Sequence, residues 1–423
     1  MVDIRDKNMC MGCFACATAC PTGCIKMTAD EEGFFYPKAD VSRCINCGKC
    51  DRVCVMKNPR QIADRKITAY ACYNKKEELI KKSSSGAMFS ILANYVLKDG
   101  GTVFGVELDE NLNPHEAMAF VPELRDKNKA SDTNIDENTS ADTADGKDKI
   151  DSQQIKNAEA EAVHLEEKTI DWPDYTDYVK KMRGSKYVQS RMDNAYELCR
   201  QELEANRKVL FSGTPCQIEG LYSYLNKEYK KLITQDIICH GTPSPKAWQY
   251  YLRYREKKAG AKAVSVSFRN KKLGWEVYSL EITFANGEVY NESMRDDPFM
   301  KSFHKNLCLR PACYSCPFKT AKKNSDFTLA DFWGISMFYP ELKHDTGTSL
   351  VLAHSWKARK IMEKVAPFIE CTPVEAGKAL KKNASIRHSA KCPDQREWFM
   401  KNVNEDNYPK LIKEFLKEIE QPV

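Results

Sequence analysis

The stretch CMGCFACATACP at residues 10–21 decides the fold of the first part of this chain. It spaces four cysteines as C-x2-C-x2-C-x3-C and ends in proline. Residues 44–54, CINCGKCDRVC, repeat the spacing, and each cysteine follows its counterpart by 34 residues, as Cys44 follows Cys10. The spacing therefore predicts an internal duplication that offers eight thiolates from two compact turns.

Thiolates at this spacing are ligands of [4Fe–4S] clusters, in the arrangement of bacterial-type ferredoxins. Each turn gives three ligands to one cluster, and the fourth cysteine of each copy ligates the other cluster. Zinc sites use C-x2-C pairs with a longer gap, and no histidine lies in this region, so zinc and disulfides are the weaker alternatives. The predicted ligand sets are Cys10, Cys13, Cys16 and Cys54 for one cluster, and Cys44, Cys47, Cys50 and Cys20 for the other.

The composition is that of a globular, charged chain of 423 residues with a net charge of +6 and 18 cysteines. No run approaches the ~20 apolar residues of a membrane span, and the charged start lacks the apolar segment of a signal peptide. We therefore expect a cytoplasmic protein, in which cysteines favour metal binding over disulfides. The mild positive charge is not the basic patch of a nucleic-acid binder, but it fits an anionic partner such as an acidic ferredoxin.

Four segments follow from the changes in composition. Residues 126–169 are polar, contain no aromatic residue and are predicted to be a disordered insertion, because they cannot bury enough apolar surface to offset their ordering entropy. The predicted segments are a cysteine-rich head at 1–58, the first part of a body at 59–125, the insertion at 126–169, and the rest of the body with C-terminal helices at 170–423.

Alternating strands and helices in the body predict an α/β domain with parallel strands. Buried strands are expected at 209–213 and 232–239, each followed by a helix, and Pro245 is expected at the first position of the second helix. We expect Asp193 to cap an earlier helix. Asn286-Gly287 is expected to be the turn of an antiparallel hairpin.

A second group of cysteines lies in the body. VLFSGTPCQ at 209–217 and IICHGTPSP at 237–245 each place a cysteine after a buried strand, where ligands gather in open α/β sheets. Cys308, Cys313 and Cys316 offer three further ligands, and Cys216 or Cys239 would supply a fourth; spacing alone does not choose. Zinc remains an alternative for this group, as does a nucleophilic role for Cys216 beside His240.

The body resembles the beta subunits of coenzyme F420 hydrogenases and dehydrogenases and the related 7-hydroxymethyl chlorophyll a reductases. The order of several short motifs carries the resemblance. They are SSSGA at 83–87, RGSKYVQS at 183–190, GTPCQI at 213–218, CHGTPS at 239–244, the cysteines at 308, 313 and 316, and ADFWG at 330–334.

This resemblance implies an FAD in the body, with a [4Fe–4S] cluster near it, and hence an α+β ferredoxin-like head followed by an α/β flavin-binding body with a mixed sheet. Ser85 and Gly86 would face flavin phosphates, and Lys186 would pair with a phosphate or the ring edge. Gly213 would allow close approach of the backbone. Thr214-Pro215 and His240-Gly241 would line the ring. From the residues alone, the favoured interpretations are a solvated lysine for Lys186 and a plain helix cap for Ser83–Ser85.

The resulting hypothesis is an oxidoreductase that connects a ferredoxin or partner subunit, through clusters and FAD, to a small hydride-accepting substrate. His240 and Cys216 are the candidate catalytic residues. The alternatives are an electron-transfer subunit without a substrate of its own, and a cluster-bearing scaffold without flavin. A roomy polar pocket would favour the first hypothesis.

Overall fold

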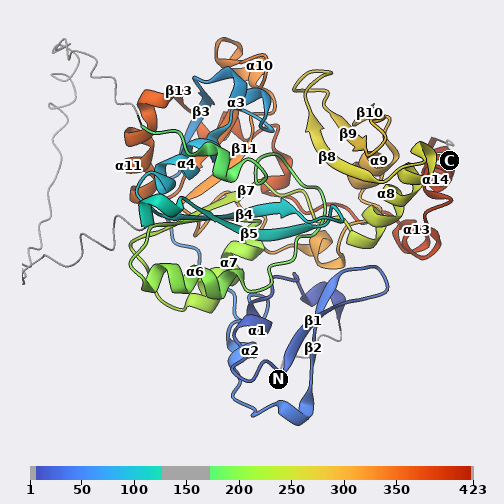
Figure 1. The fold of residues 1–423 in the computed structure, drawn as a ribbon, viewed down its shortest axis with the longest axis horizontal. Helices are drawn as coiled ribbons and strands as arrows, with labels where there is room; N and C mark the ends of the chain where they lie inside the picture. The colour runs from blue at the N-terminus through green and yellow to red at the C-terminus, as the bar shows by residue number, and fades with distance from the viewer. Residues whose placement is uncertain (1–5, 126–171, 421–423) are drawn as a thin grey trace, which may run out of the picture.

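The computed structural model describes residues 6–125 and 172–420, so the predicted insertion at 126–169 lies outside the described residues. The head lies below the body in Figure 1, as a separate blue unit with the N-terminus. It contains one antiparallel hairpin and short helical turns. Its elements are η1 (Lys7–Met9), α1 (Ala15–Thr18), β1 (Ile25–Ala29), β2 (Phe35–Ala39), η2 (Val41–Arg43) and α2 (Lys49–Arg52).

The backbone of the head repeats with its sequence. Gly12 and Asn46, which occupy equivalent positions in the two copies, both have positive φ angles of 64° and 53°. Phe14 and Gly48 are also equivalent, and both are left-handed caps, at 68° and 69°, before a one-turn helix. A positive φ is uncommon for a residue such as phenylalanine, so the cysteine turn, rather than local preference, imposes this conformation.

The body is built on an eight-stranded sheet in the order β13-β3-β12-β11-β7-β6-β4-β5. The four central strands β11, β7, β6 and β4 are parallel, and the outer strands pair antiparallel, which confirms the prediction of a mixed sheet. The strands are β3 (Thr68–Asn74), β4 (Thr102–Leu108), β5 (Pro114–Phe120), β6 (Val209–Ser212), β7 (Leu232–Ile237), β11 (Phe327–Asp331), β12 (Ser349–Ala353) and β13 (Ile369–Val374).

Helices cover the sheet on both faces, as its apolar strands require. α4 (Met88–Leu97) and α11 (Trp356–Val365) share one core cluster with β4, β6, β7 and β12. α6 (Ala195–Glu204) and α7 (Pro215–Leu225) share another core cluster, which also contains Phe14 of the head. Figure 1 shows α6 and α7 between the sheet and the head. Smaller elements are α3 (Glu77–Lys81), η3 (Thr176–Val179), η4 (Pro311–Ser315), α10 (Ile335–Phe338), η5 (Pro340–Leu342), η6 (Ala366–Phe368), α12 (Ala376–Ala379) and η7 (Ala384–Ile386).

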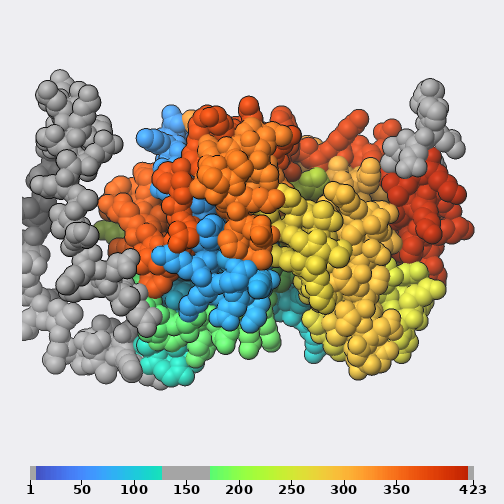
Figure 2. Space-filling view, turned by 90° about the horizontal axis from the view of Figure 1, so that it is seen from above, coloured from blue at the N-terminus to red at the C-terminus, as the bar shows by residue number. Residues whose placement is uncertain are grey.

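A side lobe packs beside the sheet and has its own antiparallel sheet in the order β10-β9-β8. Figure 2 shows this lobe in yellow beside the blue and orange part of the body. Its aromatic core packs this small sheet against the flanking helices, one of which contributes Trp248. The elements are α8 (Pro245–Ala259), β8 (Ala263–Asn270), β9 (Ser279–Phe284), β10 (Val289–Ser293), α9 (Pro298–His304), α13 (Arg396–Asn402) and α14 (Tyr408–Glu420).

Local signals succeeded where a single residue fixes the backbone. Pro245 is the first residue of α8, and the side chain of Ser244 accepts a hydrogen bond from the amide of Ala247. Gly287, at the turn between β9 and β10, has a φ of 86°. The predicted cap Asp193 was wrong, because Asp193 has a φ of 38° and Asn194 precedes the helix. No helix among the described residues is long and apolar enough to cross a membrane.

The sheet core predicts one stability effect. Phe211 on β6 is fully buried and stacks on Phe104 of β4 at 5.2 Å between ring centroids. Phe211→Ala removes this packing and leaves a cavity, so we expect a loss of about 3–5 kcal/mol in the free energy of unfolding. Urea unfolding measures it, with the exposed Val264→Ala as control. A Phe211 variant as stable as this control would contradict the packing described here.

Candidate functional site

The eight predicted cysteines of the head fall into two groups in space. Cys13 and Cys16 lie close to Cys10 and Cys54, while Cys20, Cys44, Cys47 and Cys50 line one small cavity at the far end of the head. These are the groupings predicted from the spacing. Cys24 joins the second group, with its Sγ 3.4 Å from the Sγ of Cys20. We call the first group the inner cysteine set and the second the outer cysteine set.

The inner cysteine set packs against α7 of the body. A Cβ placed on Gly220 would lie 3.2 Å from the Cβ of Cys13 and 3.3 Å from its Sγ. Cys216 precedes Gly220 by four residues on the same helix, so the two residues lie on one face. Cys13, Cys216 and Cys316 also pack against the same small apolar cluster around Met11. The inner set is therefore adjacent to the cysteines of the body.

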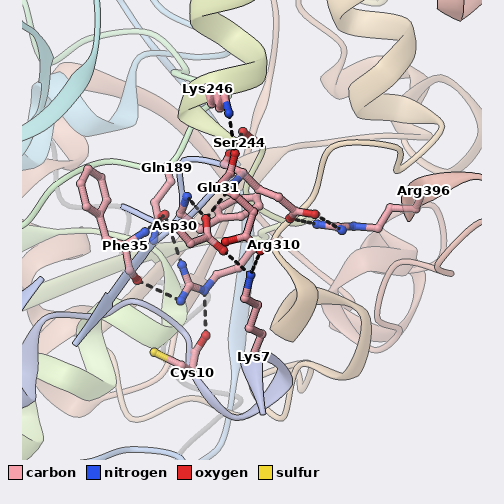
Figure 3. Close-up of polar contacts among 12 residues, drawn as sticks. Lys7, Cys10, Asp30, Glu31, Phe35, Gln189, Ser244, Lys246, Arg310 and Arg396 are labelled. Carbon is pink, nitrogen blue, oxygen red and sulfur yellow. Dashed lines mark hydrogen bonds and ion pairs between the residues drawn. The ribbon is translucent and has the colours of Figure 1, made fainter. Parts of the chain in front are cut away.

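Polar contacts from the side lobe hold the hairpin of the head (Figure 3). Arg396 of α13 forms an ion pair with Glu32 in the β1–β2 turn, and one of its two hydrogen bonds to that carboxylate is 2.6 Å long. Lys246 of α8 donates to the carbonyl of Glu31 at 2.7 Å. The hydroxyl of Ser244 donates to the carbonyl of Glu32. These contacts fix the head to the side lobe, and the contact of Cys13 with α7 fixes it to the main part of the body.

Four cysteines of the body line one narrow cavity. Cys216 lies in the first turn of α7, Cys239 follows β7, and Cys313 and Cys316 come from η4 and its end. Burial raises the pKa of Cys239 to about 12, Lys319 opposes this, and the thiols of Cys313 and Cys316 add to it. Crowded thiols of this kind lose their protons when a metal binds them. The structure thus brings both Cys216 and Cys239 to the site, where the sequence had left a choice.

Cys308, the remaining predicted ligand, does not line this cavity. Its Sγ lies 3.5 Å from the hydroxyl of Ser302, which also contacts the hydroxyl of Tyr408 at 2.9 Å. The side chain is fully buried in the core of the side lobe. Its proximity in sequence to Cys313 had suggested Cys308 as a ligand. In the structure, however, the Cys308 side chain lies in the side lobe and outside the lining of this cavity. The body cysteine set is therefore Cys216, Cys239, Cys313 and Cys316.

These sets differ from sites for a single ion. Within residues 6–125 and 172–420, no group of three or more His, Cys, Asp or Glu side chains is arranged to hold one metal ion. A tetrahedral zinc ion with bonds of about 2.3 Å would draw its sulfur ligands close together. The cysteine sets surround cavities instead, as the lining of the outer and body sets shows.

A large cavity of about 620 Å³ opens at the carboxyl ends of β6, β7 and β11. This is the place where open α/β sheets bind ligands. It adjoins the body cysteine set, since Cys216 and Cys239 belong to both walls. Most of the residues predicted to contact a cofactor line it. They are Ser85, Lys186, Gly213, Thr214, Cys216, Cys239, His240 and Gly241.

Two predicted residues have other surroundings. Pro215 lines the narrow cavity of the cysteines. Gly86 lies against the sheet, where its amide donates to the hydroxyl of Ser349 at 2.9 Å, and a Cβ would meet the carbonyl oxygen of Cys72 at 2.4 Å. Gly86 is therefore required for close packing of the segment on β3, which brings Ser85 to the cavity.

Two of the three serine hydroxyls in segment 83–85 lack hydrogen-bond partners among the described residues. The Oγ atoms of Ser83 and Ser85 are buried and make no hydrogen bond, while Ser84 bonds to Ser185 at 2.9 Å. None of them caps α4, because Ala87 is its N-cap residue without a side-chain bond. The alternative interpretation as a plain helix cap is therefore wrong.

Lys186 is not a solvated lysine. Its Nζ donates to three backbone carbonyls, those of Lys181, Met182 and Arg183, each at 2.9 Å. Burial lowers the pKa of Lys186 to about 7, and Glu107 and Glu116 oppose this shift. The lysine thus lies at the cavity wall with a pKa of about 7. An anion that binds beside it would favour its protonated, charged form.

The candidate catalytic pair has separate partners. His240 faces Asn306 with Nε2 at 2.6 Å and Ser385 with Nδ1 at 3.3 Å. The Sγ of Cys216 lies 3.2 Å from the hydroxyl of Thr214. Both ring nitrogens of His240 therefore face Asn306 and Ser385 rather than the thiol of Cys216. Burial lowers the pKa of His240, and the hydrogen bond with Asn306 opposes this shift.

One wall of the large cavity includes residues that no sequence motif connected to the site. Arg269 of β8 is buried and forms an ion pair with Asp331 at 2.7 Å, while its guanidinium lies 4.0 Å from the ring centre of Tyr278. Its Nε and Nη2 atoms have no partner among the described residues. Trp333 stacks on Trp275 at 5.6 Å nearby. Asp331 and Trp333 lie in the ADFWG motif, but nothing in the sequence connects Arg269 to it.

The fold and the site define a class of protein, namely an iron–sulfur protein with a ferredoxin-like head on a mixed α/β body. Residues 9–58 match the family model of a 4Fe–4S dicluster domain. Residues 206–376 match the family model for the C terminus of the coenzyme F420 hydrogenase/dehydrogenase beta subunit. Residues 206–376 therefore belong to this beta-subunit family, joined to a 4Fe–4S dicluster head, which confirms the family predicted from the motifs.

Two curated relatives match the head. It is 43% identical over 56 residues to NADH-quinone oxidoreductase subunit I of Pelobacter propionicus, covering 11% of this chain and 30% of that protein. It is 41% identical over 51 residues to an uncharacterised ferredoxin of Methanocaldococcus jannaschii, covering 12% of this chain and 65% of that protein. The chain thus spans less than two thirds of either relative.

Among solved structures, a chain of the F420-reducing [NiFe] hydrogenase complex from Methanosarcina barkeri is similar. The alignment covers 75% of this chain and 90% of that chain, with 14% identity and a TM-score of 0.44.

The contact between the head and α7 predicts the effect of a larger side chain. Gly220→Val would push Cys13 away and would also meet the hydroxyl of Tyr196, which lies 2.8 Å from the ideal Cβ position. We expect a lower melting temperature and loss of iron from the dicluster head. Iron analysis after anaerobic purification measures the loss, with Ser223→Val on the same helix as the matched control. Equal iron in both variants would show that this contact does not position the inner set.

Proposed function

We propose that this chain is an iron–sulfur flavoprotein oxidoreductase. It exchanges electrons between a ferredoxin or partner subunit and a small hydride-accepting substrate. The observation that carries the proposal is the large cavity beside the body cysteine set, at the carboxyl ends of the parallel strands. A flavin supplies the exchange between one-electron and hydride chemistry that clusters do not perform alone.

The residues of the cavity fit a flavin nucleotide. Its volume of about 620 Å³ lies within the range of cofactor sites, about 300–1,000 Å³. Buried polar atoms without partners cost about 1–3 kcal/mol each, so a ligand that bonds to them is favoured. The unpartnered atoms on the wall are the Oγ of Ser83 and Ser85, the Oε1 of Gln235, the Nε of Arg183, and the Nε and Nη2 of Arg269. In the proposed complex, the serine hydroxyls bond to phosphate or ribityl oxygens, and Lys186, whose three donors bond to carbonyls, contributes its charge.

The cysteine sets support a third cluster in the body. Cys216, Cys239, Cys313 and Cys316 converge from three separate segments on one cavity. Four thiols are the complete ligand set of a [4Fe–4S] cluster. The inner set reaches this site through the contact of Cys13 with α7. We therefore assign the third cluster to this body cysteine set and leave Cys308 out of it.

The tip of the head suits a protein that donates or accepts electrons. Cys47 of the outer set is exposed, and Val41 and Ile45 beside it are 69% and 65% exposed. The basic side chains of Arg43 and Lys49 flank these residues in the same segment. An apolar patch with a basic rim fits an acidic one-electron carrier such as a ferredoxin.

The cavity also supports a substrate of the chain's own. A pure electron-transfer subunit needs no open polar pocket beside its cofactor. The wall made by Arg269, Tyr278 and His304 carries polar groups that the proposed phosphate-binding segment does not use. Burial lowers the pKa of His304 to about 4, and His240 and Arg269 add to this, so its ring is neutral near pH 7. The proposal therefore favours an oxidoreductase with its own substrate.

Counting cofactors tests the proposal. Anaerobic purification of the full chain should yield about twelve iron atoms and one flavin per chain, because three clusters hold four irons each. Cys316→Ser should lose about four of these irons, whereas Cys308→Ser, a matched change in the same segment, should keep them all. A preparation with full iron but without flavin, and without binding of added FAD, would reject the flavoprotein. Loss of iron in Cys308→Ser but not in Cys316→Ser would reject the assigned set.

The pKa of Lys186 predicts proton uptake on flavin binding. A phosphate next to the amine favours its charged form, so it raises a pKa that is about 7 in the free site. At pH 7.5, binding of FAD to flavin-depleted protein should therefore take up a proton, and at pH 6 it should take up much less. Calorimetry in two buffers of different ionisation enthalpy measures this. Lys186→Met should abolish the uptake and the exposed control Lys180→Met should keep it; unchanged uptake in Lys186→Met would contradict the assignment.

A further inference from the structure

A buried arginine lies where the head meets the body. Arg310 follows Cys308 and precedes η4, and its side chain is fully buried. Its Nε donates to the carbonyl of Cys10 at 2.7 Å, and its Nη2 donates to the carbonyl of Phe35 at 3.0 Å. Figure 3 shows the guanidinium reaching from the body into the head between these two residues.

The acceptors of this guanidinium are neutral. The third acceptor is the Oε1 of Gln189, at 3.3 Å from Nη1. The ring of Tyr36 lies 4.1 Å from the guanidinium carbon and adds a cation–π contact. Among the described residues no carboxylate pairs with Arg310; the nearby Asp30 is taken by Lys7 at 2.7 Å. A buried cation without a compensating anion is unfavourable, so the protein needs a negative charge at this place.

The inner cysteine set supplies that charge when it holds a cluster. Arg310 bonds to the backbone of Cys10, the first ligand of the set, and packs against Gly12, whose ideal Cβ would lie 2.8 Å from Nη1. Four thiolates around a [4Fe–4S] core carry a net negative charge in both oxidation states. One-electron reduction makes and breaks no bond and adds one further negative charge to the group. A fixed cation beside it stabilises the reduced form more than the oxidised form.

We propose that Arg310 is the counter-ion of the inner head cluster and holds its reduction potential above that of the outer cluster. The inference rests on the clusters of the proposed function. It deepens that proposal, because it states which of the two head clusters holds the electron when only one is reduced. The outer set lies at the exposed tip, where Arg43, the cation next to Cys44, is screened by solvent. The electron in a singly reduced head therefore resides on the inner cluster, next to the body.

Arg310 also connects this charge to the body cysteine set. Its backbone carbonyl accepts a hydrogen bond from the amide of Cys313 at 2.9 Å, and its own amide donates to the carbonyl of Thr242 at 2.9 Å. The backbone of the residue is thus fixed by the segments that carry two body cysteines. Its side chain is fixed by the head. Arg310 is a positioning and tuning residue rather than a catalytic one.

Redox titration of the full-length protein, followed by electron paramagnetic resonance, tests this role. Cys47→Ser, which alters only the outer set, assigns the two head signals. Arg310→Gln should lower the equilibrium ratio of reduced inner cluster to reduced outer cluster at least tenfold. This corresponds to a change of 59 mV in the difference between the two reduction potentials, for one electron. Arg310→Lys, which keeps the charge, should shift it less. The exposed control Arg43→Gln should leave the potential of the inner cluster unchanged.

A second variant separates the charge from the folding role of the arginine. Gln189→Glu keeps the acceptor of Arg310 but places a carboxylate beside it, so it neutralises the cation without removing it. The inner potential should fall in this variant as in Arg310→Gln. Unchanged inner potentials in variants with full iron would overturn the proposal. If Arg310→Gln loses iron, the result with Gln189→Glu decides. A wild-type protein without iron would instead reject the proposed function, so the two failures are distinguishable.

Discussion

The structure depends on one close contact, the packing of Cys13 against α7 at a residue that has no side chain. Gly220 lets the cysteine turn of the head approach the helix to within van der Waals distance. Because Cys216 lies one turn earlier on the same helix, this approach fixes the distance between the inner set and the body set. In the proposed function, electron transfer between the inner set and the body set requires such proximity, which the packing of one turn on one helix provides.

The sheet fixes the second half of the arrangement. Parallel strands deliver their following loops to one edge, so the segments after β6 and β7 each bring a cysteine and a glycine to the same place. The antiparallel strand β12 begins at the same edge with Ser349, which pairs with Asp331 of β11 and accepts a hydrogen bond from the amide of Gly86. The mixed topology therefore brings residues of parallel strands and of the antiparallel strand β12 to the wall of one cavity.

The sequence predicted the features that depend on local spacing. The eight head cysteines, Pro245 at the start of α8 and the Asn286-Gly287 turn all follow from a few neighbouring residues. Cys308 lies apart from the cavity of the other body cysteines, although it is near Cys313 in sequence, because nearness in sequence does not fix which side of a turn a side chain takes. Long-range placement decides that, and here it buries Cys308 against Ser302 and Tyr408.

Other residues had no local signal at all. Arg269 and Arg310 are ordinary arginines in the sequence, and only the tertiary structure buries them beside the large cavity and the inner set. The resemblance to a family brought Lys186 and Ser85 to attention, but the partners of Lys186 are backbone carbonyls that no motif names. Charge and burial, which decide the chemistry of a site, are properties of the folded chain.

The distribution of unsatisfied polarity explains why the two ends of the molecule suit different groups. At the head, a buried cation bonds to neutral carbonyls, so the missing partner is an anion of delocalised charge, which a cluster with four thiolates provides. At the large cavity, the unpartnered atoms are two hydroxyls, one amide oxygen and three nitrogens of the guanidinium groups of Arg183 and Arg269, which suits an anionic ligand with many oxygens. Stability alone would have replaced these groups by apolar ones, because leaving them unpaired costs free energy. The two sites are joined by α7 and by the backbone of Arg310, which is the connection that the proposed electron transfer uses.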